Sequence, residues 1–142
     1  IPCIYEPGEL VGVGYDADGH EIYRTSVRTA DAETVLTVKT DKNILRAGGQ
    51  DFCFADVYVT DKNGTVKLLP DYDVKIEVVG AASLQGYGSA AYKNAEHYDQ
   101  HYHKSWQGHL QAVLRSTEKT GPVTVIFTAD GCAPAILHFS AE

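Results

Sequence analysis

Apolar and polar residues alternate with a period of two along much of the chain. The alternation is clear in residues 55–60 and 74–78, and residues 123–128 and 135–139 have the same character. These runs are rich in β-branched and aromatic residues, which strands favour. A period of two puts every second side chain on one buried face, whereas a helix repeats about every 3.6 residues. No stretch of helical length carries that longer repeat, so the pattern predicts an all-β fold.

Turn-forming residues separate these segments. Residues 16–19 end in Asp-Gly and residues 61–64 in Asn-Gly, pairs that are typical of tight hairpin turns. Residues 130–134 form a similar break before the last predicted strand. Strands separated by turns at intervals of about 8–12 residues favour an antiparallel sandwich or barrel over alternating strands and helices.

Two breaks in the pattern indicate how the chain is organised. A small, polar joint at residues 29–33 follows a segment with only about two strands, and an isolated hairpin is marginally stable in water. We therefore expect residues 1–30 to be the last strands and linker of a preceding β-sandwich, and residues 31–142 to form a second domain. The other break is residues 87–108, a polar and aromatic stretch without strand periodicity, and loops of this length are usually functional or specially packed.

Composition and charge narrow the range of partners. The formal net charge of −7 repels phosphate groups, which makes nucleic acid a poor partner. No apolar run approaches the ~20 residues that span a bilayer, so we expect no membrane insertion. The first five residues lack the features of a signal peptide, and the chain has no methionine, which indicates a segment of a longer protein. The compartment stays open among secreted, periplasmic and cytoplasmic.

The three cysteines, Cys3, Cys53 and Cys132, are an odd number at wide spacing. This arrangement is neither a disulfide framework nor a zinc motif. Because Cys53 lies within a predicted strand, we expect it to be a small buried apolar residue.

Motifs spread over nearly the whole chain carry a family resemblance. They occur in order at residues 7–15, 18–22, 27–30, 45–51, 57–64, 105–108, 112–117 and 121–125. Together they resemble the C-terminal region of bacterial family 2 glycoside hydrolases of the β-galactosidase type. The chain departs from the family's pattern in residues 86–96, so we expect the contacts of this loop to differ from those in relatives.

The resemblance implies both a fold and a role. It implies that residues 31–142 are an immunoglobulin-like sandwich of the invasin type, with about seven strands. It also implies that the parent hydrolyses β-galactosides, using two carboxylates on a TIM barrel that precedes residue 1. No catalytic residue is therefore expected in this chain. In agreement, the sequence has no nucleophile elbow, P-loop or H-E-x-x-H motif, and we expect no cofactor.

Histidines in the long loop raise the question of a metal site. His97, His101 and His103 lie within seven residues, and three imidazoles can hold zinc with one position open. On a helical turn His97 and His101 would share a face, whereas on a strand His101 and His103 would do so. No cysteine or suitably spaced carboxylate completes the set. The plainer interpretation, that these are polar residues of a solvated loop, is favoured.

Aromatic residues in the same loop raise the question of sugar binding. Aromatic faces stack on sugars while nearby amides and carboxylates bind hydroxyl groups. The alternative is that the aromatics pack the loop onto the sandwich or a neighbouring domain, and Trp106 is the expected anchor. The candidate sugar contacts are Tyr87, Tyr92, Tyr98, Tyr102 and Trp106.

Three functions follow as hypotheses. The first is a non-catalytic accessory domain whose partners are the other domains of the parent enzyme. The second is a carbohydrate-binding module that uses the aromatic loop. The third is an immunoglobulin-like repeat of a bacterial surface protein.

Overall fold

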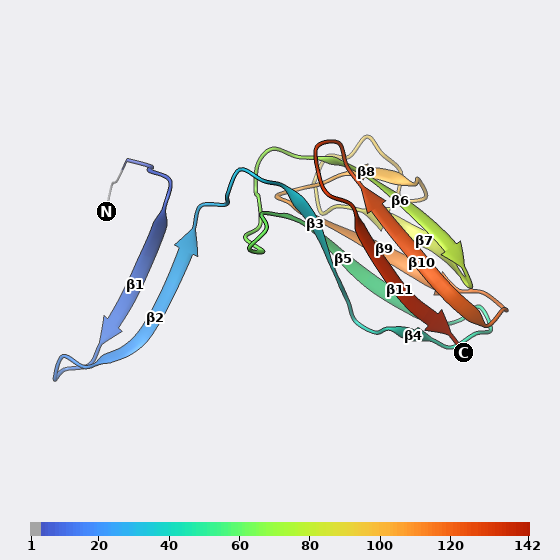
Figure 1. Cartoon of the computed structure of the whole chain (residues 1–142), viewed down its shortest axis with the longest axis horizontal. Helices are drawn as coiled ribbons and strands as arrows, with labels where there is room; N and C mark the ends of the chain where they lie inside the picture. Colours follow the sequence, from blue (N-terminus) through green and yellow to red (C-terminus); the bar gives the residue numbers. More distant parts are fainter. Residues whose placement is uncertain (1–3) are drawn as a thin grey trace.

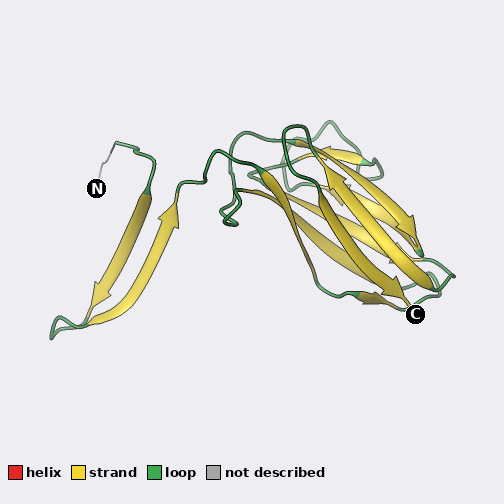
Figure 2. Cartoon of the chain, viewed as in Figure 1, coloured by secondary structure: helices red, strands yellow, loops and turns green. Residues whose placement is uncertain are grey.

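The computed structural model describes residues 4–142 (Figures 1 and 2). This part of the chain is built from strands, turns and loops, with no helix. The strands are Glu9–Tyr15 (β1), Glu21–Arg28 (β2), Val35–Thr40 (β3), Ile44–Leu45 (β4), Phe52–Thr60 (β5), Asp73–Gly80 (β6), Ala82–Gly88 (β7), Tyr102–Lys104 (β8), His109–Ser116 (β9), Gly121–Thr128 (β10) and Ala135–Ala141 (β11). Residues 4–142 contain no helix that is long and apolar enough to cross a membrane.

Strands β3 to β11 form a sandwich of two sheets. One sheet has the order β3-β5-β9-β7, and the other has the order β4-β11-β10-β6-β8. Taken in chain order, β3, β5, β6, β7, β9, β10 and β11 occupy the positions of the seven strands of a constant-type immunoglobulin domain. The additions are β4, which pairs parallel to β11, and β8, which pairs with the outer side of β6. The predicted all-β, immunoglobulin-like fold is therefore confirmed.

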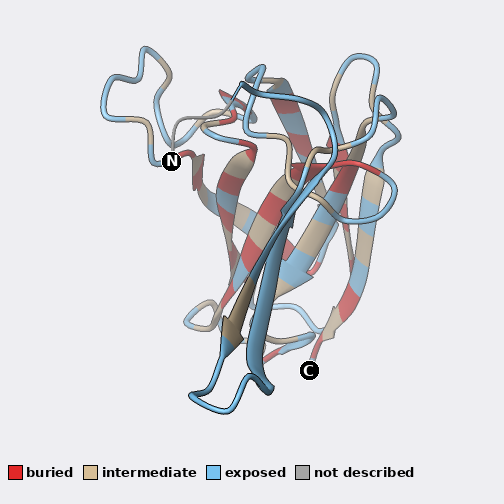
Figure 3. Ribbon diagram, turned by 90° about the vertical axis from the view of Figure 1, so that its left-hand side faces the viewer, coloured by how far each residue is buried: buried red, intermediate tan, exposed pale blue. Residues whose placement is uncertain are grey.

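The core lies between these two sheets and follows the period-two pattern. Along β5 the buried apolar residues are Cys53, Ala55, Val57 and Val59, and along β10 they are Val123, Val125 and Phe127. Each fully buried Val, Leu or Phe side chain stabilises the fold by about 1.5–3 kcal/mol. Figure 3 shows the result as buried bands alternating with exposed ones along the strands. The four segments predicted as strands lie in β5, β6, β10 and β11.

Strands β1 and β2 form a separate hairpin at the N-terminal side of the sandwich (Figure 1). They pair antiparallel from Glu9 opposite Arg28 to Tyr15 opposite Glu21. Every residue of β2 is exposed, and Figure 3 shows the hairpin pale blue over most of its length. The assignment of residues 1–30 to a preceding domain stays a prediction. Cys3 lies outside the described residues.

The turn at residues 61–64 forms as predicted but does not join two full strands. Gly64 has a positive φ of 83°, and its N–H donates to the carbonyl of Asp61. After the turn, only Val66 pairs back, with Thr60. The chain then leaves this sheet, and residues 68–72 cross to β6 in the other sheet.

The stretch 87–108 is more ordered than its sequence predicted. Strand β7 continues to Gly88, and β8 forms at Tyr102–Lys104, with His103 opposite Val74 of β6. The sequence did not indicate β8 because three residues at a sheet edge are too few to display a period of two. The loop proper is residues 89–101.

Candidate functional site

The segment 89–101 covers one open side of the sandwich. The backbone N–H of Tyr87 in β7 donates to the carbonyl of Tyr98 at 2.7 Å. The N–H of Ile76 in β6 donates to the carbonyl of His101 at 2.9 Å. Because β6 and β7 belong to different sheets, these bonds tie the segment to both layers. The segment is a packed part of the fold rather than a freely projecting loop.

The five aromatic residues proposed to contact sugar do not form one platform. Tyr87 is 1% exposed and packs against Phe127 in the core, with ring centroids 6.3 Å apart. Burial raises the pKa of Tyr87, as desolvation disfavours a phenolate. The side chain therefore lies in the core rather than on an exposed aromatic platform, and its contact with sugar stays a prediction. Tyr87 is buried because strand β7 continues to Gly88 and the Tyr87 side chain lies on the inward face of that strand. The sequence pattern did not predict a strand as far as this residue.

The other four aromatic residues are exposed or half-buried at separate places. Tyr92 meets Trp106 edge to face, with centroids 5.9 Å apart. Tyr98 lies against strands β7 and β9 of the four-stranded sheet, whereas Tyr102 lies beside Lys75 on the five-stranded sheet. Their contact with sugar stays a prediction, but no single flat ligand surface unites them.

Trp106 begins the two-residue turn that leads into β9. Its backbone N–H and carbonyl both pair with His109 at 3.1 Å. The two central residues, Gln107 and Gly108, have positive φ angles of 50° and 71°. A two-residue turn with positive φ at both positions matches the twist of paired strands. This geometry accounts for the Gln-Gly pair at these two positions.

The three loop histidines do not converge. His103 is fully buried, and its Nδ1 lies 3.1 Å from the carbonyl oxygen of Lys104. His101 is exposed, with Nδ1 3.3 Å from the carbonyl oxygen of Ile76, and His97 is also exposed. On a strand, His101 and His103 would lie on the same face. In the structure β8 begins only at Tyr102, so His101 precedes the strand and is exposed whereas His103 is buried. Nothing in this geometry supports the metal hypothesis.

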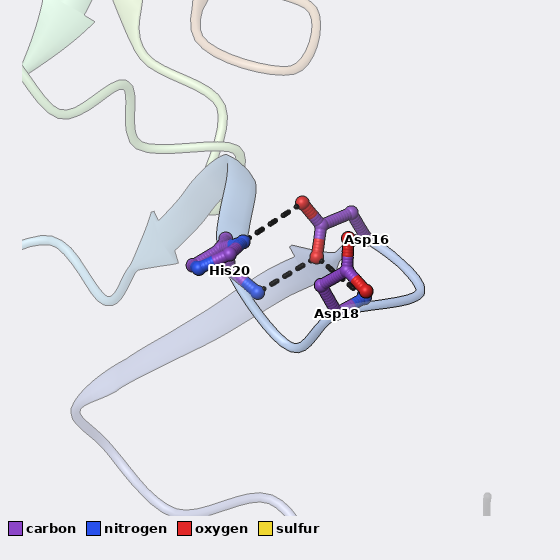
Figure 4. A group of neighbouring side chains, drawn as sticks. All are labelled: Asp16, Asp18 and His20. Carbon is purple, nitrogen blue, oxygen red and sulfur yellow. Dashed lines mark hydrogen bonds and ion pairs between the residues drawn. The ribbon is translucent and has the colours of Figure 1, made fainter.

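Within residues 4–142, one group of side chains has metal-like spacing, and it lies in the β1–β2 turn (Figure 4). The ligand atoms of Asp16, Asp18 and His20 all lie within 4.8 Å of one another. Oδ1 of Asp16 accepts the backbone N–H groups of Asp18 and His20, at 3.0 and 2.8 Å. The bond from His20 is the main cause of the lowered pKa of Asp16. These bonds shape an exposed hairpin turn, which accounts for the grouping without a metal.

A buried carboxylate lies where the hairpin joins the sandwich. Asp61 is 0% exposed, and its Oδ2 accepts the backbone N–H of Asp31 at 2.9 Å and Nη2 of Arg28 at 3.1 Å. Its Oδ1 accepts the N–H groups of Asn63 and Thr65, at 2.8 and 2.9 Å. These bonds, with that from Asp31 the largest cause, lower the pKa of Asp61 to about 2. One side chain therefore holds the end of β2, the linker and the turn after β5 together.

Sequence reasoning missed this role of Asp61. The residue was assigned only to a turn, because its partners Arg28 and Asp31 lie about thirty positions earlier in the chain. No local pattern marks such a long-range contact.

Beside this joint lies a cleft of 740 Å³ between the hairpin and the sandwich. Its lining includes Leu10 and Val27 from the hairpin, and Leu68 and Leu69 from the β5–β6 connection. All four side chains are more than half exposed, and Leu69 reaches 82%. Exposed apolar patches of this kind usually mark a surface that another element covers.

The family described as "Glycoside hydrolase family 2 C-terminal domain 5" matches residues 36–138, which is most of the sandwich. The chain belongs to this family. The predicted resemblance is thereby confirmed.

Individual relatives agree with the assignment of this glycoside hydrolase family 2 C-terminal domain. The chain is 28% identical, over 140 residues, to the β-galactosidase BoGH2A of Bacteroides ovatus; the alignment covers 97% of this chain and 16% of that protein. A solved family 2 member from Bacteroides cellulosilyticus superimposes with a TM-score of 0.91 at 22% identity, over 97% of this chain and 18% of that one. A solved family 2 β-glucuronidase gives 0.85 at 20% identity, over 99% and 15%.

The structural likenesses, at low identity, concern the fold alone. The chain spans less than a fifth of the length of each relative. Family membership favours the accessory-domain hypothesis over a repeat of a bacterial surface protein.

Proposed function

We propose that this chain is a non-catalytic accessory domain of a larger family 2 glycoside hydrolase, and that it acts by packing against the other domains of that enzyme. The proposal is carried by one observation, the β1–β2 hairpin. Leu10 and Val27 are paired on one of its faces and are 70% and 67% exposed. Tyr15, Ile22 and Tyr23 are exposed along the same hairpin.

A hairpin in this state needs a neighbour. Burying a large apolar side chain stabilises it by about 1.5–3 kcal/mol, whereas two strands alone are marginally stable in water. Both outer edges of the hairpin also carry backbone groups without a partner strand in the described chain. We infer that residues 1–30 complete a preceding β-sandwich by supplying its last strands.

The contacts of Asp61 with Arg28 and Asp31 suit this role. They link the end of β2 to the sandwich through a salt bridge and backbone hydrogen bonds rather than through an extended linker. The orientation of residues 31–142 would then follow that of the domain which receives the hairpin. The cleft lined by Leu68 and Leu69 offers a second surface beside it.

For the whole enzyme we propose hydrolysis of β-galactosides or similar β-glycosides. The support is the relative from Bacteroides ovatus, which is named a β-galactosidase and aligns over almost the entire chain. The catalytic carboxylates would lie outside these 142 residues, so in this role the domain would act through stability and assembly.

The test is a matched pair of substitutions in the full-length enzyme. Leu10→Asp places a charge on the hairpin, and Ile136→Asp places one at a similarly exposed position on β11, away from the hairpin. We expect Leu10→Asp to lower the melting temperature of the full-length enzyme and Ile136→Asp to leave it nearly unchanged. In the isolated chain, both variants should have the same melting temperature as the wild type. Equal behaviour of the two variants in the full-length enzyme would contradict the packing role.

A further inference from the structure

A second cleft lies on the outer face of the four-stranded sheet, where β7 and β9 pair. Its volume is 380 Å³, within the range of about 300–1,000 Å³ that is common for small-molecule sites. Gly86 and Gly88 of β7 contribute to its floor, and Tyr98 stands on one side. His109, Gln111 and Val113 of β9 line the other side.

The cleft exists because β7 has glycine where its neighbour has side chains. Gly86 is opposite Val113 in the sheet, and Gly88 is opposite Gln111. The side chains on β9 therefore stand beside backbone that carries no side chain; at Gly86 it is open, and at Gly88 the ring of Tyr98 packs on it. Glycine in a strand interior costs stability, and it often marks a place where another group approaches the backbone closely.

Tyr98, the opposite wall, is held in place before any ligand arrives. Its carbonyl accepts the N–H of Tyr87 at 2.7 Å, and its ring stacks on buried His103 with centroids 5.8 Å apart and planes 8° apart. A wall that is already ordered loses little conformational entropy when a ligand binds.

The polar side chains on β9 are also positioned. Oδ1 of Asp56 lies 3.0 Å from Nε2 of Gln111 and 3.2 Å from Nε2 of His109. The His109 ring is stacked on Tyr58, with centroids 4.8 Å apart. The Gln111 amide retains both donor and acceptor capacity after one hydrogen bond. The cleft thus presents an aromatic face opposite a fixed amide and imidazole.

The chemistry of the lining indicates the ligand. Among the residues that form the cleft there is no Lys, Arg, Asp or Glu, so a carboxylate or phosphate would find no countercharge. A pyranose has an apolar face that suits a tyrosine ring, and hydroxyl groups that suit an amide and an imidazole. We propose that this cleft binds one neutral sugar unit of a glycan. The site adds a binding role to the architectural one and does not depend on it.

This site differs from the aromatic platform expected from the sequence. Of those five residues only Tyr87 and Tyr98 line the cleft, and the side chain of Tyr87 is almost fully buried. The amide and imidazole contacts come from β9, outside the loop. A domain that holds a sugar weakly at this place could keep a glycan near the enzyme to which it belongs. Several weak contacts of this kind raise overall affinity through effective concentration.

The experiment is a titration of the 142-residue chain with neutral sugars, followed by backbone amide NMR. The probes are galactose, lactose, glucose and cellobiose, with glucuronic acid as a charged comparison. We expect shifts of the amides of residues 86–90, Tyr98 and residues 109–113 on addition of at least one neutral sugar, and weaker shifts with glucuronic acid. Affinity in the millimolar range is expected for a single sugar unit in an open cleft.

Variants separate the cleft from the rest of the surface. Gln111→Ala and Tyr98→Ala should each weaken binding about tenfold, the loss expected for one good contact. Gln85→Ala removes an exposed glutamine from the same strand β7 but outside the cleft, and it should bind like the wild type. Because Tyr98→Ala also removes packing, Gln111→Ala, at an exposed position, is the decisive variant.

Three results would overturn the proposal. One is the absence of cleft shifts with every neutral sugar in the panel. Another is binding that Gln111→Ala leaves unchanged. The third is protection of the cleft amides in the full-length enzyme without any sugar, which would mean that another domain fills the cleft. A failure of the packing test on Leu10 would leave the sugar proposal standing, so the two proposals fail independently.

Discussion

Gly88 is the position where one added methyl group should disturb the segment 89–101. A Cβ at Gly88 would overlap two ring carbons of Tyr98, Cδ1 and Cε1, and would lie 3.4 Å from Nε2 of His103. The backbone of Gly88 is not among those with positive φ, so alanine introduces no dihedral strain there. The effect of Gly88→Ala therefore arises almost entirely from displacement of the tyrosine ring.

The size of the effect follows from what the displaced ring loses. The stacking of Tyr98 on His103 is worth about 0.5–1.5 kcal/mol. Weakening the bond from the Tyr87 N–H to the Tyr98 carbonyl costs about 1 kcal/mol more. Replacing glycine by alanine returns about 0.4–1 kcal/mol through the unfolded state. We expect Gly88→Ala to lower the free energy of unfolding by about 1–2 kcal/mol.

Gly86→Ala is the matched control, two residues earlier on the same strand. There the nearest atom to an added Cβ is the carbonyl oxygen of Tyr98 at 3.8 Å, an ordinary contact. Gly86→Ala should therefore be neutral or stabilising by up to about 1 kcal/mol. In thermal unfolding of a domain of this size, about 1 kcal/mol corresponds to about 4 °C, so the two variants should differ clearly.

A double substitution locates the cause. If the ring of Tyr98 is the group that gives way, Gly88→Ala should cost nothing more in a Tyr98→Ala background. Equal melting temperatures of Gly88→Ala and Gly86→Ala would refute the packing described for Tyr98. So would a full cost of Gly88→Ala in the absence of the tyrosine ring.

Three further outcomes are expected. Tyr87→Phe should raise the free energy of unfolding by about 1 kcal/mol in urea titrations, because the buried hydroxyl has no hydrogen-bond partner among residues 4–142; a loss of that size would contradict this account. Folding lowers the pKa of Asp61 from 3.8 to about 2, so its stabilisation is present above pH 3.8 and lost as the pH falls through 2. The difference in melting temperature between the wild type and Asp61→Asn should therefore disappear over that window, and a constant difference down to pH 2 would contradict it. Burial raises the pKa of Cys53 to about 11, so in native protein a thiol reagent should modify half-buried Cys132 before Cys53, as measured by mass spectrometry of the labelled peptides.

The sequence by itself determined the fold class and most of the core. Alternation along residues 55–60 and 123–128 reports which side chains face inward, because a strand repeats every two residues whatever it packs against. Glycine at positions 19 and 64 marked turns, since only a residue that tolerates positive φ suits them. These signals are local. The motifs that carry the family resemblance are also short segments, which can be read from the sequence without the structure.

Only the tertiary structure decided how the segment 89–101 packs and how the contacts of Asp61 form. Strand β8 is too short to show a period, so the burial of His103 and the separation of the aromatic residues depend on contacts with β6 and β7. The role of Asp61 depends on Arg28 and Asp31, far away in the chain, and the β7–β9 cleft depends on glycines in one strand lying beside side chains of another. Such features arise from pairing between distant segments, and a single sequence has no local pattern that encodes them.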